Sequence, residues 1–85
     1  MDRAADGVLS TERAALDAAL LAAHADEDRV ALVTLYTQAA DMAGAEGDRD
    51  AMCFFLTNAY VFALETGAPE ADDLQARLKA EGREE

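Results

Sequence analysis

The segment from Ala51 to Leu64 constrains the fold most, because apolar side chains occupy nearly every face of it when it is drawn as a helix. It contains all three phenylalanines of the chain and one of its two tyrosines. Asp48 before it and Gly67 after it are typical signals for the start and the end of a helix. Such a helix has to be covered by other helices or by another chain. The sequence therefore predicts a small helical bundle with a possible association surface.

The composition limits the kinds of partner. The 85 residues fit one domain, and a hydrophobic content of 52% argues against disorder. Eighteen acidic side chains against seven basic ones give a net charge of −11. Such a surface repels phosphate backbones and anionic lipids, so we expect no direct binding to nucleic acid or to a membrane, whereas a basic protein is allowed. In the simplest interpretation the acidic residues only keep an alanine-rich helical protein in solution.

The sequence also suggests a compartment. Cys53 is the only cysteine, so no intramolecular disulfide is possible. Residues 1–7 hold no apolar run typical of a signal peptide, and no segment reaches the ~18 apolar residues of a membrane span. Six of the seven basic residues are arginine, which together with the abundant alanine is typical of a GC-rich bacterial genome. We therefore expect a cytoplasmic bacterial protein.

Helix start and stop signals divide the chain into four predicted helices. Ser10, Asp26 and Asp48 are candidate N-caps, and Pro69 suits the first turn of the last helix. The predicted helices cover about residues 11–24, 27–43, 49–66 and 69–81. No segment alternates apolar and polar residues as a strand does. The expected fold class is therefore all-α.

The predicted domain covers residues 10–82, between a flexible N-terminus at residues 1–9 and a frayed tail at residues 83–85. The connection at residues 44–48 contains two glycines and is short. A short connection between long helices favours an antiparallel hairpin. We therefore expect the hairpin of residues 27–66 to form the centre of the bundle.

Residues 30–69 resemble a tetratricopeptide-type helical hairpin. The resemblance is carried by the apolar and aromatic positions of the first helix, the small and aromatic series of the second, and the turn that follows: Leu32 and Tyr36; Ala51, Phe55, Ala59 and Ala63; Gly67, Ala68 and Pro69. It covers about half of the chain. The resemblance implies this style of helix packing and an association with protein binding, and it carries over no ligand residue.

Phe54 and Val61 interrupt the polar side of the third predicted helix. Seven residues apart, they fall on one arc of a helical projection together with four polar side chains, which are Asp50, Thr57, Asn58 and Glu65. Cys53 and Leu64 flank this arc. We expect an interaction surface formed by Phe54, Val61, Cys53 and Leu64. The alternative is that the first or the last helix of the same chain covers Phe54.

Two residues could suggest chemistry and have simpler structural roles. His24, the only histidine, lies near the predicted end of the first helix, where a cation is mildly favoured, and no neighbouring residue supplies a nucleophile. Cys53 could be a redox-sensing thiol, but its apolar neighbours indicate a small buried side chain instead. We therefore expect no catalytic residue.

Three acidic clusters lie at predicted helix starts, namely 26–28, 48–50 and 70–73. Capping and the helix dipole account for them there, and none has the spacing of a calcium-binding loop. The sequence also lacks a zinc ligand set and a glycine-rich phosphate loop. We therefore expect neither a metal site nor a cofactor.

The sequence leads to three functional hypotheses. The first is a non-catalytic helical protein-interaction module that binds another protein or a second copy of itself, as a homodimer. The second is an acidic decoy or adaptor for a basic nucleic-acid-binding protein, which the net charge of −11 suggests. The third is a small-ligand-binding helical protein with its site around Tyr36, Gln38 and Tyr60.

Overall fold

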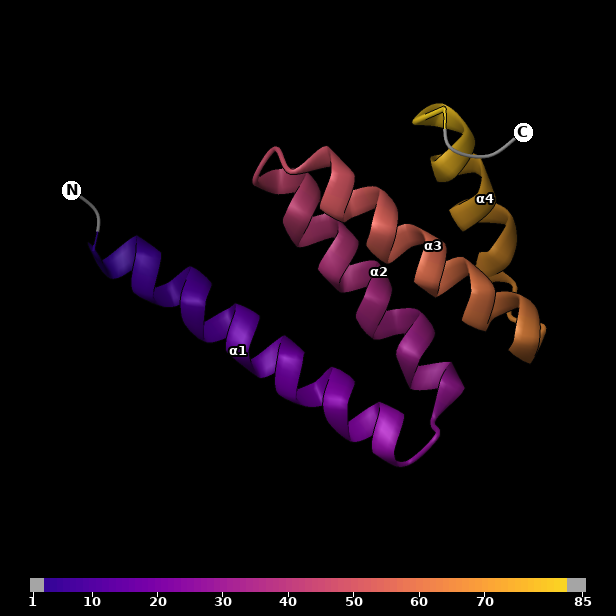
Figure 1. Ribbon diagram of the computed structural model, residues 1–85, viewed down its shortest axis with the longest axis horizontal. Helices are drawn as coiled ribbons and strands as arrows, with labels where there is room; N and C mark the ends of the chain where they lie inside the picture. Colours follow the sequence, from indigo (N-terminus) through magenta and orange to yellow (C-terminus); the bar gives the residue numbers. More distant parts are fainter. Residues whose placement is uncertain (1–2, 83–85) are drawn as a thin grey trace.

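The computed structural model describes the backbone of residues 3–82 and the side chains of residues 12–82. Four helices follow one another, each antiparallel to the one before or turning sharply from it (Figure 1). They are α1 (Arg3–Ala25), α2 (Arg29–Ala45), α3 (Arg49–Thr66) and α4 (Glu70–Ala80). No residue between 3 and 82 lies in a strand, so the all-α prediction is confirmed.

The hairpin of α2 and α3 is the centre of the fold, as predicted, and these two helices share the most extensive contact in the molecule. Small side chains let the two backbones approach, since Ala40, Ala59 and Ala63 are fully buried. α4 closes one side of the hairpin with Leu74 and Leu78. The core therefore lies among α2, α3 and α4, while α1 packs mainly on α2.

α2 and α3 begin in the same way, at a spacing of twenty residues. Asp28 and Asp48 have nearly the same backbone angles, and each carboxylate accepts a hydrogen bond of 3.1 Å from the backbone N–H three residues later. The residue before each cap has a positive φ, 56° at Glu27 and 80° at Gly47. Asp48 is the predicted cap. The prediction for α2 was wrong, because the cap is Asp28 and not Asp26, so α2 begins at Arg29.

α1 is longer than predicted. It begins at Arg3 rather than at residue 11, so Ser10 lies inside the helix and does not cap it. Residues 3–9, which we placed in a flexible N-terminus, are helical; Ala4 and Ala5 favour a helix, and Gly7 disfavours it by only about 1 kcal/mol. The N-terminal half of α1 diverges from the hairpin (Figure 1). Residues 1–2 and the predicted frayed tail at 83–85 lie outside the described residues.

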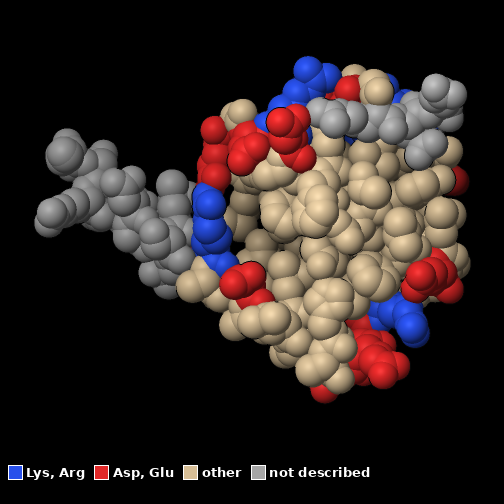
Figure 2. Space-filling model, viewed as in Figure 1, with Lys and Arg blue, Asp and Glu red and all other residues tan. Residues whose placement is uncertain are grey.

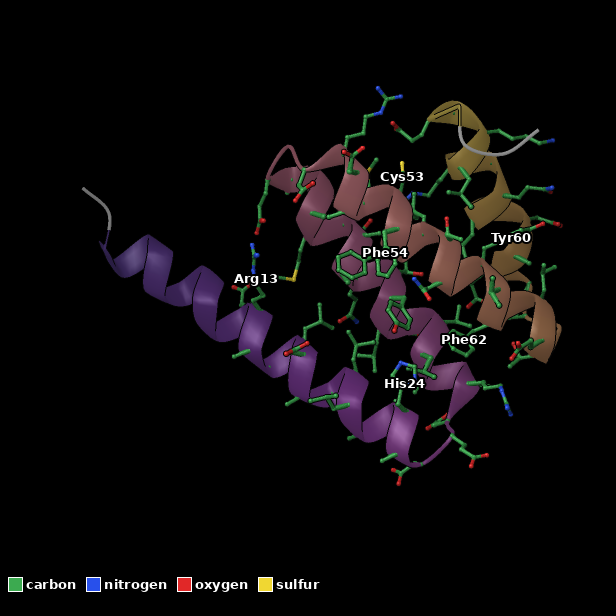
Figure 3. All side chains as sticks on the ribbon, viewed as in Figure 1. Arg13, His24, Cys53, Phe54, Tyr60 and Phe62 are labelled. Atoms are coloured by element: carbon green, nitrogen blue, oxygen red, sulfur yellow. The ribbon has the colours of Figure 1, made fainter. Side chains whose placement is uncertain are left out.

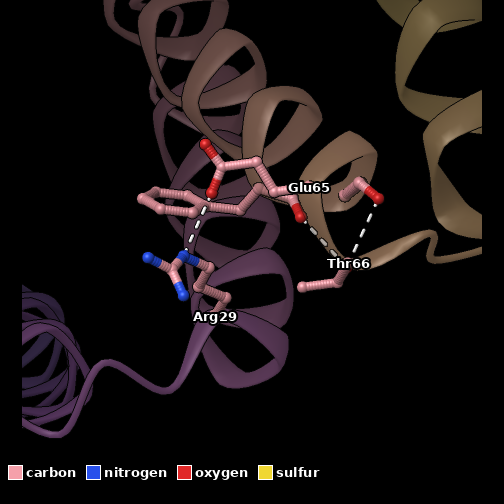
Figure 4. Close-up of polar contacts among 5 residues, drawn as sticks. Arg29, Glu65 and Thr66 are labelled. Atoms are coloured by element: carbon pink, nitrogen blue, oxygen red, sulfur yellow. Dashed lines mark hydrogen bonds and ion pairs between the residues drawn. The ribbon is translucent and has the colours of Figure 1, made fainter.

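Surface ion pairs join the helices to one another. Each pair joins an arginine of one helix to an acidic residue that lies in another helix or caps its end. The pairs are Arg13–Glu46, Arg29–Glu65 at 3.1 Å, Arg49–Glu81 at 2.6 Å and Arg77–Asp41 at 2.8 Å. Figure 4 shows the pair of Arg29 and Glu65, which joins the start of α2 to the end of α3. Because these side chains are partly exposed, each pair contributes only about 0–1 kcal/mol.

At the C-terminal end of α3, a side chain of the helix forms a hydrogen bond with a backbone carbonyl of the last turn. Thr66 Oγ1 donates to the carbonyl oxygen of Phe62 at 3.0 Å (Figure 4). Gly67 follows with φ 69°, the left-handed conformation that the sequence predicts for this position. α4 begins at Glu70, one residue later than predicted. Within residues 3–82, no helix has the length and apolar character needed to cross a membrane.

Candidate interaction surface

Phe54 is exposed to solvent on the outer side of α3. Its exposed fraction is 62%, and that of Val61, two turns later, is 43%. Neither α1 nor α4 covers Phe54, so the alternative in which another helix of the chain buries it is wrong. Figure 2 shows that charged side chains lie mainly around the edge of this view of the molecule and leave its centre uncharged. Phe54 lies near the middle of the same view (Figure 3).

The two residues that flank the predicted surface differ in their exposure to solvent. Leu64 is 57% exposed, and the helical projection places it roughly 80° around α3 from Phe54. Cys53 is only 4% exposed and does not belong to the surface. It lies three residues before Leu56 and therefore on the same side of α3, which faces the core. This burial confirms the packing role that we preferred for Cys53.

Phe54 is one end of a continuous row of rings. Its ring meets that of Phe55 edge to face at a centroid distance of 5.6 Å, and Phe55 lies 6.2 Å from Tyr36. Tyr36 stacks on Phe62 at 6.0 Å with an angle of 10° between the rings. His24 meets both Tyr36 and Phe62 edge to face. These contacts connect the exposed Phe54 on α3 to the last turn of α1.

His24 has a structural role that the sequence only partly predicts. It lies in the last turn of α1, as expected for a basic side chain. Its Nε2 atom is 2.9 Å from the hydroxyl oxygen of Tyr36 in α2. The hydrogen bond and the ring contacts hold the end of α1 against the hairpin. Tyr36 is twelve residues away in sequence, so no local pattern in the sequence indicates this partner.

A groove lies between α1 and the hairpin. It encloses about 210 Å³, and its apolar lining comes from all three helices: Leu16 and Leu20 of α1, Ala39, Met42 and Ala43 of α2, and Ala51 and Phe55 of α3. A second cavity of about 340 Å³ lies against α1 and α2 and shares Met42 and Glu46 with the first. Tyr36, Gln38 and Tyr60, the residues of the hypothetical ligand site, line neither cavity.

Acidic groups dominate the rim of the groove. Among the described side chains that line it, Asp17, Glu46 and Asp48 lie there with one cation, Arg13, which points from α1 toward the hairpin (Figure 3). Arg13 pairs with Glu46. The hydrogen bond and charge of Glu46, and then the charge of Asp48, raise the pKa of the Arg13 guanidinium above its ordinary value. Even so, these three carboxylates outnumber the one guanidinium, so the described part of the rim is negative overall.

The acidic clusters do not gather into a larger site. Asp28 and Asp48 cap helices, and the acids of the third cluster lie in the first turn of α4, where they face its dipole. Within the described part of the chain, no three histidine, cysteine or acidic side chains come close enough together to hold a metal ion.

Comparisons of this chain with family models, with characterised proteins and with solved structures gave no match.

Proposed function

We propose that this protein is a non-catalytic helical protein-interaction module that forms a homodimer through the surface around Phe54 and Val61. The observation that carries the proposal is the 62% exposure of Phe54 in a chain whose other two phenylalanines are at least half-buried. A phenylalanine side chain contributes about 1.5–3 kcal/mol when it moves from water into an apolar interface. Large aromatic anchors of this kind dominate the binding energy of many interfaces.

The ring contacts of Phe54 favour binding. Because its ring already rests against Phe55, it loses less conformational freedom on association than a free side chain would. Ordering a side chain at an interface otherwise costs about 0.5–1.5 kcal/mol. Phe55 in turn packs against the ring of Tyr36, so this part of α3 is held in place before a second copy binds.

The distribution of charge favours a contact at this face. Two copies with a net charge of −11 each repel one another, least where the surface carries no charge. The uncharged centre of the face in Figure 2 meets that condition. A two-fold axis would bring the same patch of both copies together, which is the commonest arrangement of soluble oligomers. The resemblance of residues 30–69 to a tetratricopeptide-type hairpin also supports a role in protein binding.

The proposal is tested by the solution mass, measured by light scattering from about 1 µM to about 1 mM protein, the range of weak to moderate dimers. We expect twice the monomer mass at high concentration. Added salt should strengthen the dimer, because it screens the repulsion between two acidic chains. A monomer mass at every protein and salt concentration would contradict the proposal.

A further inference from the structure

The groove between α1 and the hairpin is apolar inside and acidic at its rim, and it does not include Phe54. We propose that it binds an amphipathic helix, with basic residues beside its apolar stripe, from another protein. This interaction goes beyond self-association and uses a different surface. It would give the acidic-adaptor hypothesis a defined place on the molecule.

The shape of the groove suits two turns of a helix. The cavities follow α1 from Glu12 to Leu20, a rise of about 12 Å, which is the length of two helical turns. Leu16, Leu20 and Phe55 stand at its sides and are half-buried, so each keeps apolar surface for a partner to cover. Helices that bind in such grooves insert apolar side chains at intervals of three and four residues.

The charge of the rim selects a basic partner. Asp17, Glu46 and Asp48 together exceed the charge of Arg13 by two, and Glu12 lines the adjoining cavity. A helix that carries lysine or arginine beside its apolar stripe would bring cations to these carboxylates. Such complementarity raises the rate of encounter and disfavours partners of the wrong charge.

The same charges disfavour a second copy of this chain in the groove. The exposed side of its α3 has an acid at each end, with Asp50 about one turn before Phe54 and Glu65 about one turn after Val61. Inserting that side would therefore bring acids against the acidic rim.

The test uses two synthetic helical peptides of about 18 residues, long enough to form a helix on binding. Both carry the same leucine stripe; lysines flank it in one peptide and glutamates in the other. Fluorescence anisotropy measures the binding of each to the full chain. We expect the lysine peptide to bind at least about tenfold more tightly and to weaken as salt rises from about 50 to about 300 mM. Equal binding of the two peptides, or no binding of either, would overturn the proposal.

Matched variants locate the site. Leu16→Gln removes an apolar side chain from the groove without changing the net charge, and Leu21→Gln makes the same change on the outer side of α1, where Leu21 is 68% exposed. We expect Leu16→Gln to weaken binding of the lysine peptide about fivefold or more and Leu21→Gln to leave it unchanged. Equal effects of the two substitutions would overturn the proposal.

A second pair tests the rim and does not alter the packing of α1. Asp17→Asn should weaken binding about threefold, whereas Asp72→Asn in α4, which removes the same charge far from the groove, should not. Equal losses would show that the peptide responds only to net charge and would overturn the proposal. Phe54→Asp should leave peptide binding intact, so failure of the homodimer and failure of the groove can be told apart.

Discussion

His24 in α1 and Tyr36 in α2 are joined by a hydrogen bond of 2.9 Å between Nε2 and the hydroxyl oxygen. Their rings also meet edge to face at a centroid distance of 5.9 Å. α1 has few other specific contacts with the hairpin, and its N-terminal half diverges from it (Figure 1). The pair therefore fixes the end of α1 next to the groove.

Tyr36→Phe should loosen α1 and leave the hairpin unchanged. The substitution removes the hydroxyl but keeps the ring, so only the hydrogen bond, worth about 0.5–1.5 kcal/mol, is lost. We expect amide hydrogen exchange in residues 16–25 to become about threefold to tenfold faster, with α3 unaffected. Tyr60 lies on the side of α3 away from α1 (Figure 3), so Tyr60→Phe is the control for loss of a tyrosine hydroxyl elsewhere. Equal exchange in the two variants would show that the bond does not hold α1.

The turns before α2 and α3 have a positive φ at equivalent places but different residues there. Substitutions at the two places should therefore change the stability of the protein in opposite directions. Glu27 has φ 56° although it is not a glycine, whereas Gly47 takes φ 80° at the equivalent place. An L-residue pays about 1–2 kcal/mol in this conformation. Gly47→Ala, where an added Cβ meets no atom, should therefore destabilise the protein by about 1 kcal/mol, and Glu27→Gly should stabilise it by about 0.5 kcal/mol. Urea unfolding measures both, and effects of the same sign would refute this explanation.

The contact between α2 and α3 should dominate stability. Leu56 is fully buried in the core, so Leu56→Ala should lower the free energy of unfolding by about 2–5 kcal/mol. Leu64→Ala in the same helix makes the identical change at a side chain that is 57% exposed, and it should cost less than about 0.5 kcal/mol. Thermal or urea unfolding measures the loss of stability in each variant. Similar losses in the two variants would show that Leu56 does not lie in the core.

Cys53 should be protected from thiol reagents while the protein is folded. It is a free cysteine with an exposed fraction of 4%. Reaction with Ellman's reagent should therefore be at least about tenfold slower in the native protein than in urea, because it requires local opening. The same burial predicts no disulfide between two copies on a non-reducing gel. Fast labelling of the native protein would show that Cys53 reaches the surface.

The sequence predicts most of the hairpin because its signals are local. The cap at Asp48, the left-handed Gly67 and the alternation of small and large side chains each depend on a few neighbouring residues. The start of α2 was harder to predict, since both Asp26 and Asp28 can cap a helix. The signal that identifies Asp28 as the cap is its position twenty residues before Asp48, at the equivalent place before the preceding helix.

The other errors concern how the helices pack and where α1 begins. Cys53 lies at the border of the polar arc of α3, and the packing of neighbouring helices decides whether such a border position is buried. The groove and the bond between His24 and Tyr36 depend on the angle between α1 and the hairpin, which periodicity does not encode. α1 begins early because its first residues favour a helix although Ser10 resembles a cap.

The most direct test of the account is the solution mass of the Phe54→Asp variant, measured by sedimentation. It is compared with the masses of the Leu21→Asp variant and the unchanged chain, at a concentration where the unchanged chain is dimeric. Both substitutions add one negative charge at an exposed apolar side chain, 62% and 68% exposed, on different helices. Circular dichroism should show the same helix content in all three. We predict that Phe54→Asp is monomeric and Leu21→Asp remains dimeric. A Phe54→Asp variant that stays dimeric would contradict the claim that Phe54 anchors the interface.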